Sequence, residues 1–311
     1  VVKYFGLGEG GTTDNPGEWW NNLIDIERSG PFTNQDPFET WTPKTLDCQV
    51  PLGTYRVEYG MLLTNAENGG DGAVYVDDVN LTLISLPFKP QTKDELQTAV
   101  DLWESDNLSA LTSYGEISLW DVSLITDMTD LFANKETFNG NISSWDVSNV
   151  NSMFYTFYGA TSFDGDLSSW DVSNVTNMDW MFSNATIFNS DLSLWDVSNV
   201  TSMVAIFSHT SFDQDLSSWD VSNVTNMDYL FWGAYNFNQD ISEWNVSNVI
   251  TMVEMFNGAT SFNQDISSWN VSNVEEMSNI FEGALAITDE NKCAIHTSWS
   301  SNSNWPYDWS A

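Results

Sequence analysis

The stretch FNQDISSWNVSNV, residues 262–274, decides the fold of this chain because close copies of it recur along the sequence at a fixed spacing. Its tryptophan returns every 25 residues, with a single interval of 24, at Trp120, Trp145, Trp170, Trp195, Trp219, Trp244 and Trp269. Around each tryptophan, apolar residues stand at positions −3, +2, +5, +8 and +12. Such self-similarity is the sequence signature of a repeat protein, in which neighbouring units share one core.

Two columns of the repeat have no exception. Position +8 is always methionine (Met128, Met153, Met178, Met203, Met227, Met252, Met277) and position +12 always phenylalanine (Phe132, Phe157, Phe182, Phe207, Phe231, Phe256, Phe281). A single unit cannot bury these side chains, so we predict that successive coils stack about 4.8 Å apart around one core. The spacing from tryptophan to +2 suits a strand, and the spacing of +5, +8 and +12 suits one face of a helix. We therefore predict an α/β coil made of a strand, a Ser-Asn turn and a short helix.

The unit resembles the repeats of the BspA-like leucine-rich-repeat family, a group of microbial surface proteins, over residues 115–285. The resemblance implies a leucine-rich-repeat-like solenoid, here with seven coils. It also implies attachment to surfaces or to other proteins, and it brings no catalytic residues with it.

The segments that flank the repeats are predicted to close the two ends of the solenoid, because terminal units must shield the apolar core from water. Residues 88–114 hold a linker and a capping helix, with Thr92 as its N-cap and Glu95 three residues later. Residues 286–311 depart from the repeat and are predicted to form an irregular, tryptophan-rich cap.

Residues 1–87 have a different character, and we predict a separate antiparallel β-domain there. Glycine-rich turns separate alternating stretches such as residues 55–59 and 73–76. The words PFETW at 37–41 and YVDDVNL at 75–81 resemble the galactose-binding-like β-sandwich of carbohydrate-binding modules. Because such modules are usually longer, we expect a small and incomplete sandwich.

This second resemblance implies two candidate sites. Trp19, Trp20 and Trp41 are candidates for stacking on sugar rings, with a place in the core as the alternative for Trp41. Asp77 and Asp78 are candidates for holding a structural calcium ion.

The chain is strongly acidic, with 44 Asp and Glu against 8 Lys and Arg and a formal charge of −36, which argues against nucleic acid or an anionic membrane as partner. Many acids fall in two rows, one directly after the tryptophan and one four residues before it. The rows hold Asp121, Asp146, Asp171, Asp196 and Asp220, and Asp166, Asp191, Asp215, Asp240 and Asp265. At a spacing of about 4.8 Å in water, neighbours repel by about 0.9 kcal/mol. We expect compensation by hydrogen bonds from Ser or backbone N–H groups, in the form of an Asp or Asn ladder that bonds to neighbouring coils, or by calcium threaded along the rows.

Catalytic patterns are missing from the sequence. It has two His residues and lacks metal-type Cys or His spacing, a phosphate-binding glycine loop and a nucleophile elbow. Repeats also place identical acids in rows, whereas a glycosidase needs two acids in different environments. We therefore expect a non-enzymatic protein without a certain cofactor.

Several features favour a secreted protein at the cell surface. The chain has no apolar run long enough to span a bilayer, and its start at Val1 leads us to expect a processed or truncated chain. Among nine glycosylation sequons, Asn184, Asn107 and Asn80 are the candidates for N-glycans.

The expected function is self-assembly or adhesion outside the cell. Cys48 and Cys293 lie near opposite ends of the chain, so they are candidates for an intermolecular disulfide in a head-to-tail filament, with two buried thiols as the alternative. A second possibility is a glycan-binding module on a solenoid stalk. A third is an ice-binding solenoid, although the threonine row at Thr176, Thr201 and Thr225 is interrupted by Asn151 and Ile250.

Overall fold

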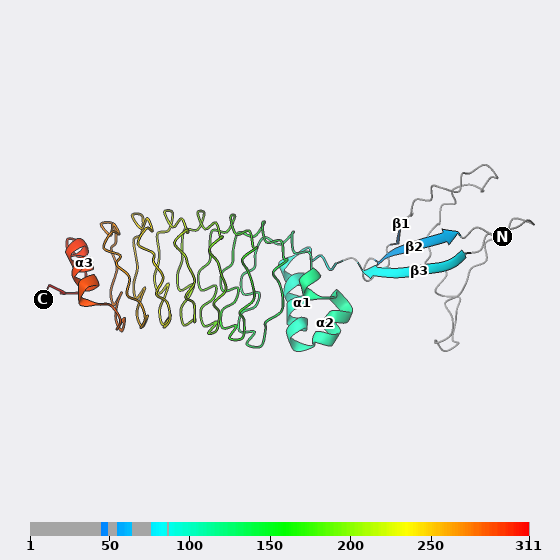
Figure 1. The fold of residues 1–311 in the computed structure, drawn as a ribbon, viewed down its shortest axis with the longest axis horizontal. Helices are drawn as coiled ribbons and strands as arrows, with labels where there is room; N and C mark the ends of the chain where they lie inside the picture. Colours follow the sequence, from blue (N-terminus) through cyan, green and yellow to red (C-terminus); the bar gives the residue numbers. More distant parts are fainter. Residues whose placement is uncertain (1–44, 49–54, 64–75, 86, 311) are drawn as a thin grey trace, which may run out of the picture. The chain divides into compact units, whose positions relative to one another are not determined.

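A computed structural model describes residues 45–48, 55–63, 76–85 and 87–310. The chain divides into two compact units, residues 1–86 and 87–311, and each is described by itself. Figure 1 shows the elements in chain order.

The first unit contains an antiparallel sheet in the order β1-β2-β3, formed by Thr45–Cys48, Tyr55–Leu63 and Val76–Ser85. β2 includes the stretch 55–59 that was predicted as a strand. Residues 73–75 of the other predicted stretch lie outside the described residues. The β-sandwich therefore stays a prediction.

The second unit begins with a helical cap at the position where the sequence predicted one. In α1 (Lys93–Ser105), Thr92 Oγ1 accepts the N–H of Glu95 at 3.2 Å, and Glu95 Oε2 accepts the N–H of Gln91 at 2.6 Å. The helix buries Leu96, Ala99 and Val100, and the Trp103 ring packs edge-on against the Trp120 ring of the first coil at 5.8 Å. α2 (Asn107–Tyr114) and the 3-10 helix η2 (Ile117–Leu119) then lead into that coil.

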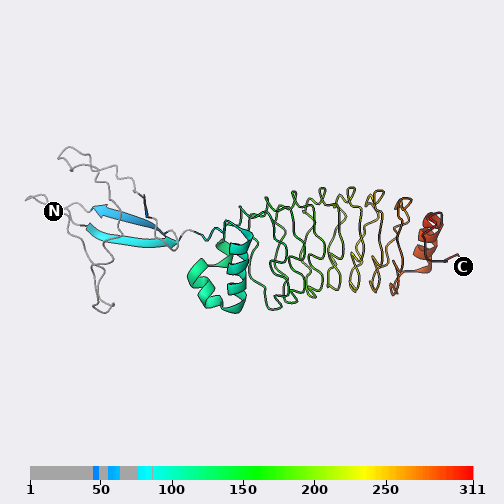
Figure 2. The same cartoon turned by 180° about the vertical axis from the view of Figure 1, so that it is seen from behind.

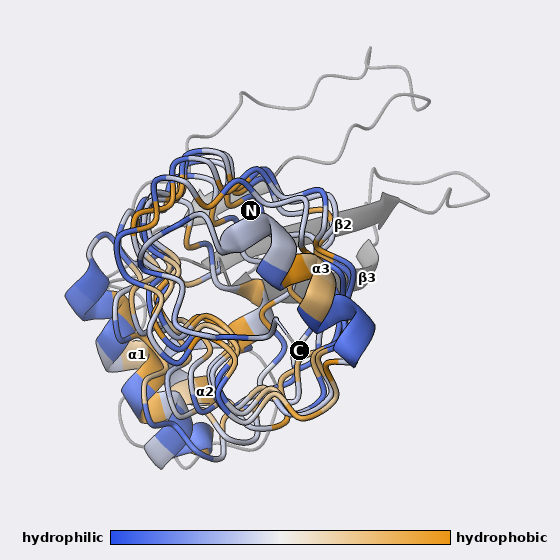
Figure 3. Cartoon of the chain, turned by 90° about the vertical axis from the view of Figure 1, so that its left-hand side faces the viewer, coloured by the Kyte–Doolittle hydropathy of each residue, from blue (hydrophilic) through white to orange (hydrophobic). Residues whose placement is uncertain are grey.

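Residues 120–287 form coils that lie side by side in chain order, as Figures 1 and 2 show from opposite sides. In the view along the stack, successive coils follow nearly the same outline (Figure 3). The predicted Trp, Met and Phe columns are buried and form one continuous core. Rings of successive coils are neighbours: the Trp120 and Trp145 centroids are 6.2 Å apart, and those of Phe132 and Phe157 are 5.0 Å apart. The repetitive, aromatic core is thus confirmed.

The tryptophan column also fixes the coils by hydrogen bonds. Trp145 Nε1 donates to the carbonyl of Ile117 in the preceding coil at 2.8 Å, and each later tryptophan of the column does the same one coil further on, at 3.0 to 3.1 Å. Sequence reasoning did not predict a second buried phenylalanine column, which stacks parallel to the first and comprises Phe138, Phe163, Phe188, Phe212, Phe237 and Phe262.

The predicted strand and short helix within each coil are wrong. Between residues 120 and 287 the structure has turns and isolated parallel bridges between coils, such as that from Asp127 to Ser152. The Tyr155 N–H donates to the backbone carbonyl of Asp179 in the next coil. The Tyr158 N–H donates instead to the backbone carbonyl of Tyr155 within its own coil. Since Tyr155 itself has φ +56°, this segment is a run of turns in which alternate N–H groups reach the next coil.

The C-terminal cap also differs from the irregular structure predicted for it. It begins with α3 (Asp289–Trp299), whose N-cap Thr288 accepts the N–H of Asn291 at 3.3 Å. Trp299 stacks on Trp269 at 6.1 Å and so covers the end of the tryptophan column. Trp305 packs edge-on against Trp299, and Trp309 follows it in the same aromatic cluster.

Candidate functional surface

The two acidic rows lie on exposed turns beside the tryptophan column. Asp196 Oδ1 accepts the N–H of Ser198 at 3.0 Å, and Asp191 Oδ1 accepts the N–H of Ser193 at 2.9 Å. Where the row changes to Asn245, its side-chain oxygen accepts the N–H of Ser247 in the same way, at 3.2 Å. Each acid therefore closes a turn in its own coil and is held in a fixed direction.

The donors are backbone N–H groups of serine, as expected, but they belong to the same coil, which corrects the ladder of hydrogen bonds expected to neighbouring coils. Hydrogen bonds from the hydroxyl and then the N–H of Ser198 hold the pKa of Asp196 below its usual range. The pKa of Asp191 is lowered by the N–H and hydroxyl of Ser193, although the neighbouring Asp166 opposes this weakly. At Asp191, the bonds within its own coil thus outweigh the repulsion from the neighbouring acid of the row.

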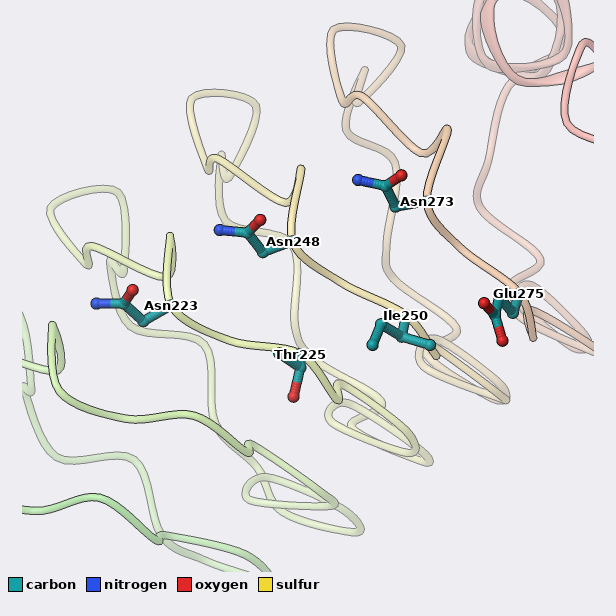
Figure 4. A pocket seen from close by; sticks show the side chains of 6 residues that line it. All are labelled: Asn223, Thr225, Asn248, Ile250, Asn273 and Glu275. Carbon is teal, nitrogen blue, oxygen red and sulfur yellow. The ribbon is translucent and has the colours of Figure 1, made fainter.

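Bonds between coils come instead from an asparagine row at position +4. Asn174 Nδ2 donates to the carbonyl of Ser148 in the preceding coil at 2.7 Å. The same bond, at 2.7 to 2.8 Å, is made by Asn149, Asn199, Asn223, Asn248 and Asn273. Parallel amides on successive coils are visible in Figure 4.

A shallow groove of about 580 Å³ runs beside this asparagine row across the last coils. Its second wall is the +6 row, where Thr225, Ile250 and Glu275 follow one another (Figure 4). The mixture of hydroxyl, methyl and carboxylate groups interrupts the threonine row, as the sequence indicated. The groove has no convergent set of catalytic groups among its lining residues.

Among the described residues, the acidic rows do not form a cluster of side chains dense enough to hold the calcium that was one of the two expectations. In the part of the chain that the structure describes, His, Cys, Asp and Glu side chains do not gather in groups of three that could hold a metal ion. Asp77 and Asp78 lie in β3, where side chains are outside the description, so that site stays a prediction.

Cations are concentrated near the two ends of the coil stack. Lys89 pairs with Asp121, the first acid of its row, at 2.8 Å, and Lys135 pairs with Asp101 of α1 at 2.7 Å. The sequence has neither Lys nor Arg between Lys135 and Lys292, although 21 Asp and Glu lie in that interval. The coil stack therefore presents negative charge almost without internal compensation.

The remaining predicted residues are dispersed. Trp19, Trp20 and Trp41 lie outside the described residues, so the glycan site stays a prediction. Cys48 ends β1, and Cys293 is exposed on α3 without a disulfide partner among the described residues.

The glycosylation candidates also differ in setting. Asn80 lies in β3, and Asn107 is exposed at the start of α2. Asn184 is half-buried with φ +61°, where related coils carry glycine. Because Asn tolerates this left-handed conformation, the turn itself explains the residue type.

Sequence reasoning missed one further surface. Half-buried aromatic residues occupy positions +10 and +13 in neighbouring coils, where other copies carry polar or small residues. The only available signal was their departure from the repeat at positions that do not contribute to its apolar columns.

Among the described residues, none of the helices has the length and apolar character required to cross a bilayer. Comparison with known proteins gives one match: residues 105–213 and 205–304 fit the family model described as Mycoplasma protein of unknown function, DUF285. Neither the curated proteins nor the solved structures gave a significant match.

Proposed function

Since the chain belongs to the DUF285 family of proteins of unknown function, whose model covers residues 105–304, we propose that it is a non-enzymatic extracellular surface protein that mediates adhesion. In this proposal the coils form a leucine-rich-repeat-like solenoid. It serves the purpose that the resemblance to BspA-like proteins implies, which is attachment to surfaces or to other proteins. The stack serves as a stiff scaffold whose surface binds a partner of opposite charge.

The observation that carries the proposal is the fixed, uncompensated acidity of the coils. Asp191 and Asp196 are each held by a serine of the same turn, so little side-chain freedom is lost when a partner binds. Like charges in rows attract a cationic surface over a distance set by the salt concentration, about 8 Å at physiological ionic strength. A positively charged face of another protein is therefore the expected partner.

Adhesion can be tested with microspheres that carry the full chain. We expect them to attach to a surface coated with a basic protein and to leave an acidic one bare at 0.15 M salt, about the physiological value. Attachment should weaken as salt is raised, because the interaction is between exposed charges. Failure to attach to the basic surface, or equal attachment to both, would contradict the proposal.

A matched control separates ordered acidity from net charge alone. Phe182→Asp adds one negative charge but places it in the buried phenylalanine column, so it should disrupt the stack. Microspheres with this variant should adhere less than wild type. Undiminished adhesion would mean that the ordered rows are not responsible.

Self-assembly is the second candidate, supported by the exposed Cys293 on α3. Both ends of the coil stack are covered, by α1 and by the cluster around Trp299, so growth by adding coil to coil is disfavoured. Head-to-tail growth would instead use Cys293 and Cys48. Non-reducing electrophoresis of the full chain should then give a ladder that Cys293→Ser abolishes, and a single monomer band would count against covalent assembly.

A further inference from the structure

Five aromatic side chains form a surface that the repeat does not require, here called the aromatic edge. Tyr155, Trp180 and Tyr229 occupy position +10 of their coils, and Tyr158 and Trp232 occupy position +13. All five are half-buried rather than part of the core. Other coils place Asp130, Ala205, Glu254 or Asn279 at position +10 with the same backbone, so the fold does not need rings there.

The backbone at position +10 makes these rings unexpected. Tyr155, Trp180 and Tyr229 have φ of +56°, +60° and +60°, in the left-handed region that bulky L-residues avoid. At position +14, where φ is also positive, the chain uses the favourable residues, for example Gly159 and Gly233. Aromatic residues at +10 thus occupy a backbone conformation that disfavours them, which points to a role outside folding.

The rings form two groups separated by one coil. In the first, Tyr155 stacks on Trp180 with centroids 5.8 Å apart and planes 3° apart, and Tyr158 stands edge-on to Tyr155 at 4.9 Å. In the second, Tyr229 and Trp232 are 5.7 Å apart, and the His209 ring of the intervening coil stands edge-on to Trp232 at 4.5 Å. The intervening coil has Ala205 at the equivalent position, so the column of rings is interrupted there.

Carboxylates act on one tyrosine of each group. Burial raises the pKa of the Tyr155 hydroxyl, and Tyr158 and the carboxylates of Asp130 and Asp179 raise it further. Burial likewise raises the pKa of Tyr229, with Glu254 and then Asp228 adding to the effect.

The ring faces and the carboxylates therefore create negative potential in the same place. Such a combination favours a cation over a neutral ligand.

We propose that the aromatic edge is the docking site for an extended basic segment of a partner protein, with one Arg or Lys side chain at each ring group. The inference rests on the proposed adhesive function and names its partner. A second copy of this chain is disfavoured as occupant by charge, because each copy carries −36 and has neither Lys nor Arg from residue 136 to 291.

The spacing of the two groups specifies the segment further. Trp180 and Tyr229 are two coils apart, about 10 Å for coils spaced like parallel strands. A polyproline II helix brings every third residue to the same side, about 9.3 Å further along. Cations three residues apart in a proline-rich segment thus match both groups at once.

The test uses a fluorescein-labelled peptide, Arg-Pro-Pro-Arg-Pro-Pro-Arg, and fluorescence anisotropy with the full chain at about physiological salt. The variant Tyr155→Asn/Trp180→Asn/Tyr229→Asn keeps the net charge and uses the residue that the chain itself has at Asn279. We expect this variant to bind about tenfold more weakly or worse, from the loss of cation–π contacts, with an unchanged circular dichroism spectrum.

Two controls make the outcome decisive. Asp196→Asn/Asp220→Asn removes two charges in a row that already contains Asn245 and Asn270, and it should weaken binding less than about threefold because exposed charges act weakly. A peptide of the same composition with its three arginines adjacent should bind more weakly than the spaced one.

The inference is overturned if the aromatic variant binds like wild type, or if the charge variant weakens binding as much as the aromatic one. It is also overturned if neutral oligosaccharides bind the edge and the basic peptide does not. In each of these cases microsphere adhesion can persist, so the proposed function would survive the failure of this site.

Discussion

At the scale of single residues, the acidic rows are stabilised by their own turns. Ser198 and Ser193 donate to Asp196 and Asp191 and lower the pKa of both carboxyls, at Asp191 against a weak opposing effect of Asp166 in the preceding coil. The sequence indicated the rows and the need for compensation. It could not indicate which coil supplies the donor, because that depends on the direction of each side chain.

Acid should therefore destabilise the coil stack. In residues 87–310, the Asp carboxyls whose pKa departs from its ordinary value all have a lowered pKa, because hydrogen bonds stabilise their charged form, so the folded state holds these protons less tightly than the unfolded state does. The stability that these carboxyls contribute is then fully present above the ordinary Asp pKa of about 3.8, and it is lost as the pH falls below that value. Thermal unfolding followed by circular dichroism between pH 6 and 3 should show a falling midpoint, whereas a rising midpoint would mean that repulsion dominates.

The left-handed turn residues give a second prediction at this scale. Ala205 is buried with φ +53°, so Ala205→Gly should raise the free energy of unfolding by about 0.5–1 kcal/mol. Ala160 is equally buried without a positive φ, and Ala160→Gly should lower the free energy of unfolding by about 0.4–1 kcal/mol, because glycine makes the unfolded chain more flexible. Equilibrium denaturation of the two variants measures both changes, and the same sign for both would refute the turn geometry.

At the scale of the coil, the phenylalanine column at position +12 is part of the buried core. Phe182 is fully buried and lies between the rings of Phe157 and Phe207, at 5.5 and 6.1 Å. Phe182→Ala should therefore cost about 3–5 kcal/mol of stability in urea denaturation. The matched control is Leu194→Ala, since Leu194 is 81% exposed and its loss should cost less than about 0.5 kcal/mol. Equal costs would contradict a core built from the +12 column.

The coil also shows how far the sequence could be interpreted. Identity at positions 0, +8 and +12 predicted the buried columns and their stacking, because a shared core explains three apolar positions that are identical in all seven copies. The short helix was wrong because apolar residues at +5, +8 and +12 also fit consecutive turns. The positive φ of residues such as Tyr155 distinguishes the turns from a helix. Tyrosine as a residue type does not indicate a positive φ, so the sequence could not make this distinction. The aromatic edge was missed for the same reason.

At the scale of the whole molecule, charge should govern stability as well as binding. The 21 Asp and Glu between Lys135 and Lys292 repel one another with no Lys or Arg among them. Sodium chloride should therefore raise the melting midpoint between about 0.01 and 0.5 M, because screening shortens to about 4–5 Å at the higher value. Calcium chloride at matched ionic strength should give the same midpoint in the coil stack, and a much larger rise would indicate a bound ion.

The central claim is that successive coils lie in register, like residue above like residue. Pulsed electron spin resonance tests it most directly, with one spin label on Leu119→Cys and the other on a cysteine at the equivalent position of a later coil, in a Cys48→Ser/Cys293→Ser chain. The later positions are Leu194, Ser218, Glu243 and Ser268, all exposed. The distance between labels should grow linearly, by about 5 Å for each added coil. Distances that fail to increase with coil number would contradict the stacked repeat and everything inferred from it.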